Sequence, residues 1–436
     1  MTSPRLLPLI DELLRRAGRG MVLGLDRVKR SLVKLGHPEE RCAFVHITGT
    51  NGKGSTSAMV SSIARAAGLR TGLFTSPHLS RWAERVSVNG EPISDEAFAD
   101  ALERVFAVSE EGLTFFEALT LAGFVAFDAA SIEFGVLEVG IGGKQDATNV
   151  LKKPLATAIT SVALDHMAIL GDSIAAIAAD KAGIFRPDVP VVLGPLVDEA
   201  LAVVLGAANE IGAGPIYRVA REGDVLGNGI FSARLLQNRL AQIELPGCDP
   251  ITTKLSLAGA HQVANAGVAA AIAMAASQQF PTLRTSIAAG LSTTTWPGRL
   301  ERLVVDGKQI LLDCAHNPHG ALTLKAYLQD EGISAERILL VFGALGDKAW
   351  QEMLSILGPL ATRRVYTSPK GRAPAPLEAM AAQFDGVIVP EGREAVRQAI
   401  RMAGEGDLVV VAGSIYLVGE IRSEILGIAS DPAVAL

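Results

Sequence analysis

The sequence predicts an α/β protein with a mostly parallel, doubly wound sheet followed by a second, smaller α/β domain. Short apolar runs rich in β-branched residues alternate with helical stretches, which is typical of buried parallel strands. A glycine-rich segment at residues 49–55 joins one of these strands to a helix. A second alternating series begins after residues 296–298. We therefore expect two domains, covering residues 1–295 and 296–436.

The first domain is expected to contain a series of buried strands, at residues 43–48, 71–75, 134–139, 156–163 and 189–193. Helices are expected at residues 55–67 and 115–130, and the N-terminal stretch predicts an amphipathic helix. Asn89 and Gly90 at the centre of residues 85–93 indicate a hairpin. In residues 216–254 apolar and polar residues alternate more than in the preceding strands, and turn residues are frequent. This pattern suggests a small antiparallel excursion from the main sheet.

The second domain is expected to be Rossmann-like. Its predicted strands lie at residues 310–313, 338–342, 365–367, 387–389 and 408–412, with helical segments between them. A chain of 436 residues is long enough for two or three domains.

Composition excludes several classes of protein. The net charge of −6 and the absence of a dominant basic patch argue against nucleic-acid binding. Three scattered cysteines are too few for a disulfide framework, and no export signal or membrane-spanning run is evident. We expect a cytoplasmic protein that binds small molecules and acts as a monomer.

The segment from Gly49 to Ser55 predicts a phosphate-binding loop of the P-loop ATPase type. Glycines let backbone N–H groups approach phosphate oxygens, and the helix that follows adds a favourable dipole. Lys53 is placed to reach the β and γ phosphates. The expected nucleotide ligands are Thr50, Asn51, Gly52, Lys53, Gly54 and Ser55. The loop departs from the standard pattern because Gly54 occupies the position of the usual magnesium-binding hydroxyl.

Three other side chains follow or end predicted strands. They could supply the magnesium ligand that the phosphate-binding loop lacks. Ser76, Glu138 and His166 should meet the phosphate loop, because loops after parallel strands converge at one sheet edge. A hydroxyl, a carboxylate and an imidazole there would hold Mg²⁺. The alternative is that Glu138 is a solvated rim residue and His166 a satisfied polar group.

The motifs as a set resemble the folylpolyglutamate synthase and dihydrofolate synthase family of the Mur ligase superfamily. The resemblance starts with the loop at residues 49–55 and extends from about residue 20 to the C-terminus. Further matches follow in order: TSPHL at 75–79, FFEALT at 115–120, LEVGIGG at 137–143, DATN at 146–149, DH at 165–166, DKAGI at 180–184, PGRLE at 297–301 and DCAHNP at 313–318. Three positions depart from the pattern, with Lys144-Gln145 replacing the usual Arg-Leu and Asp180 replacing a common glutamate.

The resemblance implies ATP and two Mg²⁺ ions as cofactors. It implies the same metal ligands, Ser76, Glu138 and His166, and adds Lys181, carbamylated so that it carries a carboxylate. Lysine must be neutral to capture CO₂, so we expect burial or nearby cations to lower its pKa. The alternative is a helix-end lysine that complements the helix dipole. Lys53, His166 and Lys181 are the expected catalytic residues.

Other residues receive their expected roles from the same resemblance. Asn265, Arg299, Asp313 and His316 are implied to bind the nucleotide, with a helix cap as the alternative for Asn265. Local loop structure is the alternative for Asp313 and His316. Phe115, Phe116, Glu117 and Asp146 are implied to border the folate or pteroate substrate, although core packing is almost as plausible for either phenylalanine.

The implied reaction adds L-glutamate to dihydropteroate, a folate or both, through an acyl phosphate. A Mur-type ligase for peptidoglycan precursors is the alternative enzyme, against which Gly54 and residues 115–117 and 146–149 argue. A nucleotide-binding regulator without ligase activity is the alternative of another class. The sequence leaves the acceptor and the length of the glutamate chain open.

Overall fold

The computed structural model describes residues 3–17, 24–109, 112–237 and 239–431. These residues form two compact units. The first contains residues 1–77, 83–256 and 260–295, and the second contains residues 296–436 together with 78–82 and 257–259. The sequence places one boundary between residues 295 and 296, and the structure adds two short segments to the second unit.

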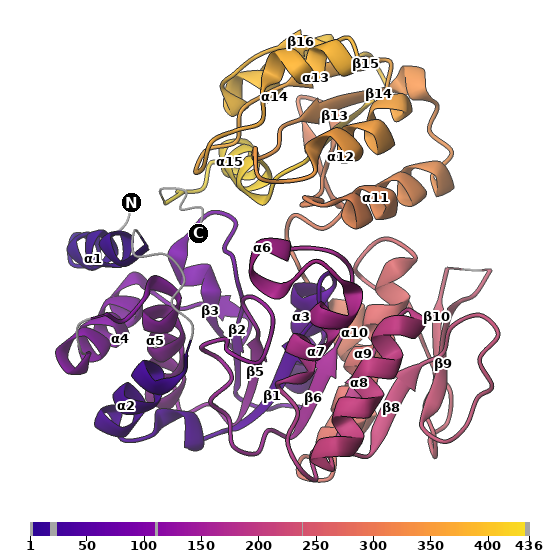
Figure 1. The fold of residues 1–436 in the computed structure, drawn as a ribbon. Coiled ribbons are helices and arrows are strands. Elements are labelled where there is room, and N and C mark those ends of the chain that lie inside the picture. Colours follow the sequence, from indigo (N-terminus) through magenta and orange to yellow (C-terminus); the bar gives the residue numbers. More distant parts are fainter. Residues whose placement is uncertain (1–2, 18–23, 110–111, 238, 432–436) are drawn as a thin grey trace. The chain divides into compact units, whose positions relative to one another are not determined.

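The first unit is built on an 11-stranded sheet in the order β11-β10-β9-β8-β7-β6-β1-β5-β2-β3-β4 (Figure 1). All pairs from β9 to β2 are parallel, and the pairs at both ends are antiparallel. The strands are β1 (Ala43–Thr48), β2 (Thr71–Phe74), β3 (Val86–Val88), β4 (Glu91–Pro92), β5 (Phe134–Glu138), β6 (Ala156–Ile159), β7 (Val191–Leu193), β8 (Ile216–Val219), β9 (Ile230–Leu235), β10 (Ala241–Glu244) and β11 (Ile251–Thr253).

Helices cover both faces of this sheet (Figure 1). Helices α3, α9 and α10 pack together, and α3 and α9 also contact the central strands. The α-helices of the unit are α1 (Leu7–Ala17), α2 (Asp26–Leu35), α3 (Lys53–Ala66), α4 (Asp95–Val108), α5 (Phe115–Ala129), α6 (Met167–Leu170), α7 (Ile174–Ala182), α8 (Asp198–Ile211), α9 (His261–Ala276) and α10 (Thr282–Thr293). A short 3₁₀ helix, η1 (Pro38–Glu40), precedes β1.

The predicted antiparallel excursion at residues 216–254 is more closely joined to the sheet than expected. Strands β8 and β9 continue the parallel order beyond β7, and only β10 and β11 run antiparallel. The alternating exposure of β10 results from its position near the sheet edge, where one face meets solvent.

The second unit has a 6-stranded sheet in the order β12-β13-β17-β14-β15-β16. All its pairs are parallel except β12 with β13. Its strands are β12 (Glu301–Val305), β13 (Lys308–Leu312), β14 (Ile338–Phe342), β15 (Arg363–Tyr366), β16 (Val387–Ile388) and β17 (Leu408–Ala412). Its α-helices are α11 (Pro318–Asp330), α12 (Trp350–Leu357), α13 (Leu377–Gln383), α14 (Gly392–Met402) and α15 (Ile415–Leu426). The predicted α/β class with a mostly parallel sheet and a smaller second domain is confirmed.

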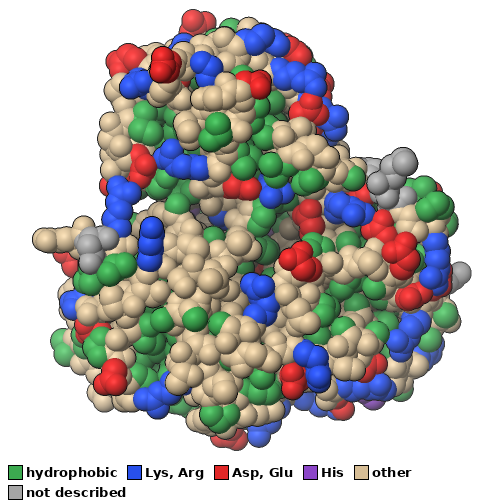
Figure 2. Space-filling model, turned by 180° about the vertical axis from the view of Figure 1, so that it is seen from behind, with side chains coloured by type: hydrophobic (Ala, Val, Ile, Leu, Met, Phe, Trp, Pro, Cys, Tyr) green, Lys and Arg blue, Asp and Glu red, His purple; other side chains and the backbone are tan. Residues whose placement is uncertain are grey.

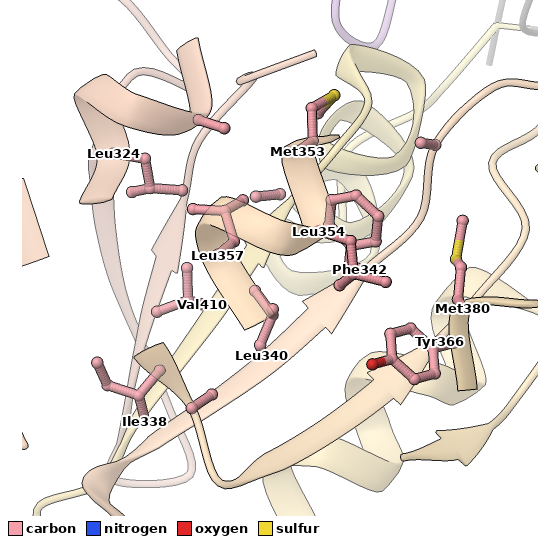
Figure 3. Close-up of a cluster of buried hydrophobic side chains, with 14 of the residues drawn as sticks. Leu324, Ile338, Leu340, Phe342, Met353, Leu354, Leu357, Tyr366, Met380 and Val410 are labelled. Carbon is pink, nitrogen blue, oxygen red and sulfur yellow. The ribbon is translucent and has the colours of Figure 1, made fainter. Parts of the chain in front are cut away.

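A buried apolar cluster holds α11, α12 and α13 against one face of the second sheet (Figure 3). Leu340 and Phe342 of β14 point toward Leu354 and Leu357 of α12 in this view. The strand is buried at every residue, which explains why its sequence is continuously apolar rather than alternating.

Surface charge is mixed. Lysine, arginine, aspartate and glutamate side chains are interspersed on the face shown in Figure 2. Within the described part of the chain, no helix combines the length and apolarity that a membrane crossing requires.

Candidate active site

The site in the first unit forms at the carboxyl edge of three adjacent strands. Strand β1 lies between β6 and β5, and both pairs are parallel. The glycine-rich loop after β1, residues 139–149 after β5 and residues 160–166 after β6 therefore leave the sheet at the same edge. Open parallel sheets bind ligands at this edge.

The segment after β6 fixes the shape of the glycine-rich loop. Thr50 Oγ1 donates to the carbonyl of Ala163 at 3.1 Å and accepts its amide at 3.0 Å. Ser161 Oγ accepts the amide of Asn51 at 2.9 Å, and Thr160 Oγ1 donates to the Asn51 carbonyl at 2.7 Å. Two hydroxyls directly after a strand are the sequence signal for this support, and neither residue was among the expected site residues.

Helix α9 packs directly on the loop. Gly52 has a φ of +86°, and a Cβ there would lie 2.5 Å from Asn265 Oδ1. Gln262 Nε2 donates to Ser55 Oγ at 3.4 Å and Gln262 Oε1 accepts from Asn265 Nδ2 at 2.9 Å. Asn265 lies inside α9, whose N-cap is Ala260, so the helix-cap alternative is wrong. Asn265 therefore lies beside the phosphate loop, as expected for a residue that binds the nucleotide.

Lys53 begins α3 and turns back over its own loop. Its Nζ donates to the carbonyls of Gly49 at 2.9 Å and Thr50 at 3.2 Å. The ammonium group therefore lies at the loop that should receive the phosphates. A long flexible side chain in this position can exchange carbonyl oxygens for phosphate oxygens without a change of backbone.

Ser76 and Glu138 lie together. Strands β2 and β5 are parallel neighbours, and the Ser76 amide donates to Glu138 Oε2 at 3.3 Å. Glu138 is buried at the end of β5. A buried carboxylate and the hydroxyl that its neighbour Ser76 carries are the kind of hard oxygen ligands that Mg²⁺ prefers.

Lys181 is only 3% exposed, although it is a charged residue near the end of α7. Burial and the nearby positive charge of Lys53 lower the pKa of Lys181 to about 7, against the opposing effects of Asp180, Asp165 and Asp146. The lysine is therefore largely neutral above neutral pH. Lys181 does lie in the last turn of α7, as the helix-end alternative requires, so its burial and not its position sets it apart from an ordinary helix-end lysine.

His166 belongs to the segment after β6 but is more exposed than Lys181. It has a φ of +49°, and its amide donates to Asp165 Oδ1 at 2.9 Å. The charge of Asp165 raises the pKa of Lys181, against the effects of burial and Lys53. Asp165 was not among the expected site residues, and the sequence signal for it was its position beside His166.

Asp146 supports the loop after β5. Its carboxylate accepts from the amides of Ile141 and Thr148, each at 3.0 Å, and from Thr148 Oγ1 at 2.6 Å. Thr148 Oγ1 also lies 2.8 Å from His46 Nε2. Burial lowers the pKa of His46 to about 3, so the imidazole is neutral. Because Thr148 gives its proton to Asp146, His46 must donate its Nε2 proton to Thr148.

Phe115 and Phe116 at the start of α5 differ in their burial. Phe115 is buried beneath the guanidinium of Arg85, and Phe116 is half-buried. A Cβ on Gly140 would lie 2.5 Å from Phe116 Cζ, which places this ring beside the loop after Glu138. Core packing accounts for Phe115, whereas Phe116 lies next to the site.

Glu117 carries two structural interactions. Its Oε2 accepts the Thr114 amide at 2.7 Å, and Thr114 Oγ1 accepts the Glu117 amide at 3.3 Å, which makes a capping box for α5. Arg27 Nη2 lies 2.8 Å from Glu117 Oε1. Its carboxylate oxygens are engaged within the protein.

The second unit places Arg299, Asp313 and His316 around the carboxyl end of β13. Asp313 accepts the amides of Leu300 at 3.0 Å and Ala315 at 2.9 Å. Burial raises the pKa of Asp313, and Arg299 opposes the rise. His316 Nδ1 lies 2.9 Å from the Cys314 carbonyl, and burial raises the pKa of the Cys314 thiol to about 12. Cys314 is therefore a protonated core thiol and not a nucleophile.

Family models match both units of the chain. Residues 47–273 match the Mur ligase middle domain, and residues 298–415 match the glutamate ligase domain of Mur ligases. The dihydrofolate synthase/folylpolyglutamate synthase of Bacillus subtilis is 34% identical over 423 residues, which cover 93% of this chain and 96% of that protein. The chain belongs to the folylpolyglutamate synthase and dihydrofolate synthase family of Mur ligases.

Solved structures of this family agree with the fold. Escherichia coli FolC in complex with DHPP and ADP has a TM-score of 0.86 at 29% identity, with 98% of each chain covered. The bifunctional enzyme of Yersinia pestis complexed with AMPPNP and a Mn ion has a TM-score of 0.85 at 30% identity and the same coverage. A Haloferax volcanii relative, named as a probable bifunctional folylpolyglutamate synthase/dihydropteroate synthase, is 34% identical over 414 residues. The chain spans about half the length of that protein, 48%.

The hydrogen-bonded chain of His46, Thr148 and Asp146 gives a stability prediction for this family member. Replacing Thr148 with valine removes the hydroxyl between the imidazole and the carboxylate, and leaves a buried donor without its acceptor. We expect the free energy of unfolding to fall by roughly 1–3 kcal/mol, as measured by urea denaturation. Thr252→Val, an exposed threonine of β11, is the matched control and should change it by less than about 0.5 kcal/mol. An equal effect of both variants would contradict the proposed chain.

Proposed function

We propose that this chain is an ATP-dependent ligase that joins L-glutamate to the carboxylate of dihydropteroate, a folate or both. The observation that carries the proposal is the arrangement around the phosphate loop. The loop lacks a hydroxyl at Gly54, while the buried Lys181 packs against Gly143 in the loop after β5, and the charge of Lys53 helps to lower its pKa. The adjacent Ser76 and Glu138 pair supplies a hydroxyl and a carboxylate from neighbouring strands.

In the first proposed step, a carboxylate oxygen of the acceptor attacks the γ phosphorus of ATP. The bond from that phosphorus to the leaving oxygen of ADP breaks, and an acyl phosphate forms. Lys53 neutralises charge on the transferred phosphoryl group, and the loop amides and Asn265 position the nucleotide. The chain needs no nucleophilic side chain, because ATP activates the carboxylate.

In the second proposed step, the amine of L-glutamate attacks the acyl carbon. The carbon–oxygen bond to phosphate breaks, inorganic phosphate leaves, and the nitrogen loses a proton as the amide forms. We assign Arg299, Asp313 and His316 of the second unit to the nucleotide. Phe116 is proposed to border the flat ring of the acceptor, whereas Phe115, Glu117 and Asp146 shape the elements around it.

The residues present suit Mg²⁺. Ser76, Glu138, His166 and a carbamylated Lys181 are proposed to hold it, and bound Mg²⁺ neutralises charge on the phosphates. Glu138 is a buried carboxylate with a hydroxyl-bearing neighbour, which is a suitable donor set. We further propose that the protein acts in the cytoplasm as a monomer on small molecules, without nucleic-acid or membrane partners.

The proposed function is tested by ADP release from the purified full chain with ATP, Mg²⁺ and L-glutamate. Dihydropteroate and tetrahydrofolate are compared as acceptors, and ADP release should depend on both the acceptor and glutamate. Release with both acceptors indicates a bifunctional enzyme. A UDP-muramoyl substrate tests the Mur-type alternative, and activity with that substrate alone would overturn the proposal. Nucleotide binding without glutamate-dependent ADP release would instead support a regulator.

A further inference from the structure

A group of three potential metal ligands lies outside the proposed active site. His37, Glu39 and Glu40 lie between α2 and β1, and one ligand atom from each can be chosen so that all lie within 4.8 Å of one another. His37 Nδ1 is 2.9 Å from Glu39 Oε1. Adjacent ligands on one tetrahedral metal ion are separated by roughly 3.4 Å when each lies about 2.1 Å from the ion. The imidazole and the first carboxylate are now at hydrogen-bond distance, and a separation wider by about half an ångström would let both bind one ion.

Glu39 is the buried member of the group. Its side chain is 6% exposed, so this carboxylate is more than nine-tenths buried. Among the described residues, Glu39 Oε2 is a buried oxygen without a hydrogen-bond partner. A buried carboxylate oxygen without a partner carries a desolvation cost that a bound cation would offset.

Lys152 shows that this carboxylate pair attracts a cation. Its Nζ lies 2.6 Å from Glu40 Oε1, and the Lys152 side chain is 78% exposed. Glu40 and, more weakly, Glu39 raise the pKa of this lysine. Arg41, the other nearby cation, is paired with Asp128 at 3.0 Å. An exposed ammonium can move aside, since surface ion pairs contribute little.

We propose that His37, Glu39 and Glu40 form a second metal site, which binds a Zn²⁺-class divalent cation through one imidazole nitrogen and two carboxylate oxygens. This donor set suits zinc better than magnesium because magnesium favours oxygen ligands alone. Water completes the coordination, since His37 and Glu40 are solvent-accessible. The proposal is independent of the proposed ligase activity.

The second site is separate from the phosphate loop. Residues 37–40 precede the first residue of β1, Ala43, whereas the phosphate loop follows its last residue, Thr48. At about 3.3 Å for each residue of a strand, the two ends of β1 are roughly 15–20 Å apart. A metal at residues 37–40 therefore joins α2 to the start of the central strand and stabilises the fold without touching the nucleotide.

The test is isothermal titration of the metal-stripped full chain with ZnCl₂ in excess Mg²⁺, which competes with zinc at the proposed catalytic metal site, and the variants of the second site identify the zinc bound there. We expect one zinc site per chain that persists under excess Mg²⁺. Its affinity should fall at least about tenfold in His37→Ala and Glu40→Gln, whose changed side chains are exposed enough to leave folding intact. Glu39→Gln should abolish zinc binding at this site. The melting temperature of the wild-type protein should rise when zinc is added.

Two further variants make the test specific. Lys152→Ala removes the competing ammonium, so zinc should bind at least about threefold more tightly. Glu91→Gln, an exposed glutamate of β4, should leave binding unchanged. Visible absorption of Co²⁺ in place of Zn²⁺ should report nitrogen and oxygen ligands and disappear in His37→Ala. Absence of a zinc site under excess Mg²⁺, or equal binding by wild type and both exposed variants, would overturn the proposal.

Discussion

Replacing Lys53 with alanine is expected to lower turnover about 10²–10³-fold, which corresponds to about 2.7–4 kcal/mol of transition-state stabilisation. The Lys53 ammonium donates to the loop carbonyls of Gly49 and Thr50, so a cation lies at the loop where the proposed mechanism develops negative charge. Glycines around it expose backbone amides, but no other loop side chain carries a positive charge. The measurement is the kcat of glutamate-dependent ADP release.

Two controls separate this electrostatic effect from misfolding. Lys254→Ala removes an exposed lysine of the same unit and should leave kcat unchanged. The melting temperature of Lys53→Ala should stay close to that of wild type, because the hydrogen bonds from Thr50, Thr160 and Ser161 still hold the loop. A kcat within about threefold of wild type would remove Lys53 from the proposed mechanism.

The sheet was predictable because its strands are buried on both faces. Strand β1 has the predicted bounds, 43–48, since its apolar run ends at the glycine-rich turn. Strand β12 was missed, because its residues alternate between half-buried and exposed at a sheet edge and leave no continuous apolar run. The second unit's two short segments, 78–82 and 257–259, were also not predictable, because their assignment depends on tertiary contacts.

The site was predictable where a motif directly follows a strand, as in the pairing of Ser76 with Glu138. Contacts that depend on how helices dock were not predictable. The approach of Asn265 to Gly52 requires α9 to lie on α3, so it was expected only from the family resemblance and could not be derived from the spacing of residues along the chain. The capping role of Glu117 was visible in the sequence, since Thr114 precedes it by three residues, but its pairing with Arg27 was not.

Lys181→Ala is expected to abolish glutamate-dependent ADP release, and added bicarbonate should not restore it. Wild type in CO₂-depleted buffer should lose activity and regain it with bicarbonate, because the carbamate of Lys181 would supply a metal-binding carboxylate. Lys153→Ala, an exposed lysine of the same unit, should respond to bicarbonate as wild type does. Full activity of wild type in CO₂-free buffer would contradict carbamylation.

The environment of Lys181 gives this prediction a pH dependence. Burial first, and then Lys53, lower the pKa of Lys181 to about 7, and only the neutral amine attacks CO₂. At pH 8 about nine-tenths of this lysine is neutral, against well under a hundredth of an ordinary lysine. At a fixed concentration of dissolved CO₂, the carbamate should therefore form as pH rises through about 7 and be lost below it. ¹³C NMR after labelling with ¹³CO₂ measures the modified fraction directly.

The neighbouring charges predict opposite shifts of that pH midpoint. Asp180 stabilises the charged lysine, so Asp180→Asn should move the midpoint to lower pH. Lys53 destabilises the charged lysine, so Lys53→Ala should move the midpoint to higher pH. A lysine that served only to pack α7 would show neither a carbamate signal nor this pair of opposed shifts. Because the readout is the carbamate itself, it remains measurable in Lys53→Ala, where turnover is too slow to report the modification.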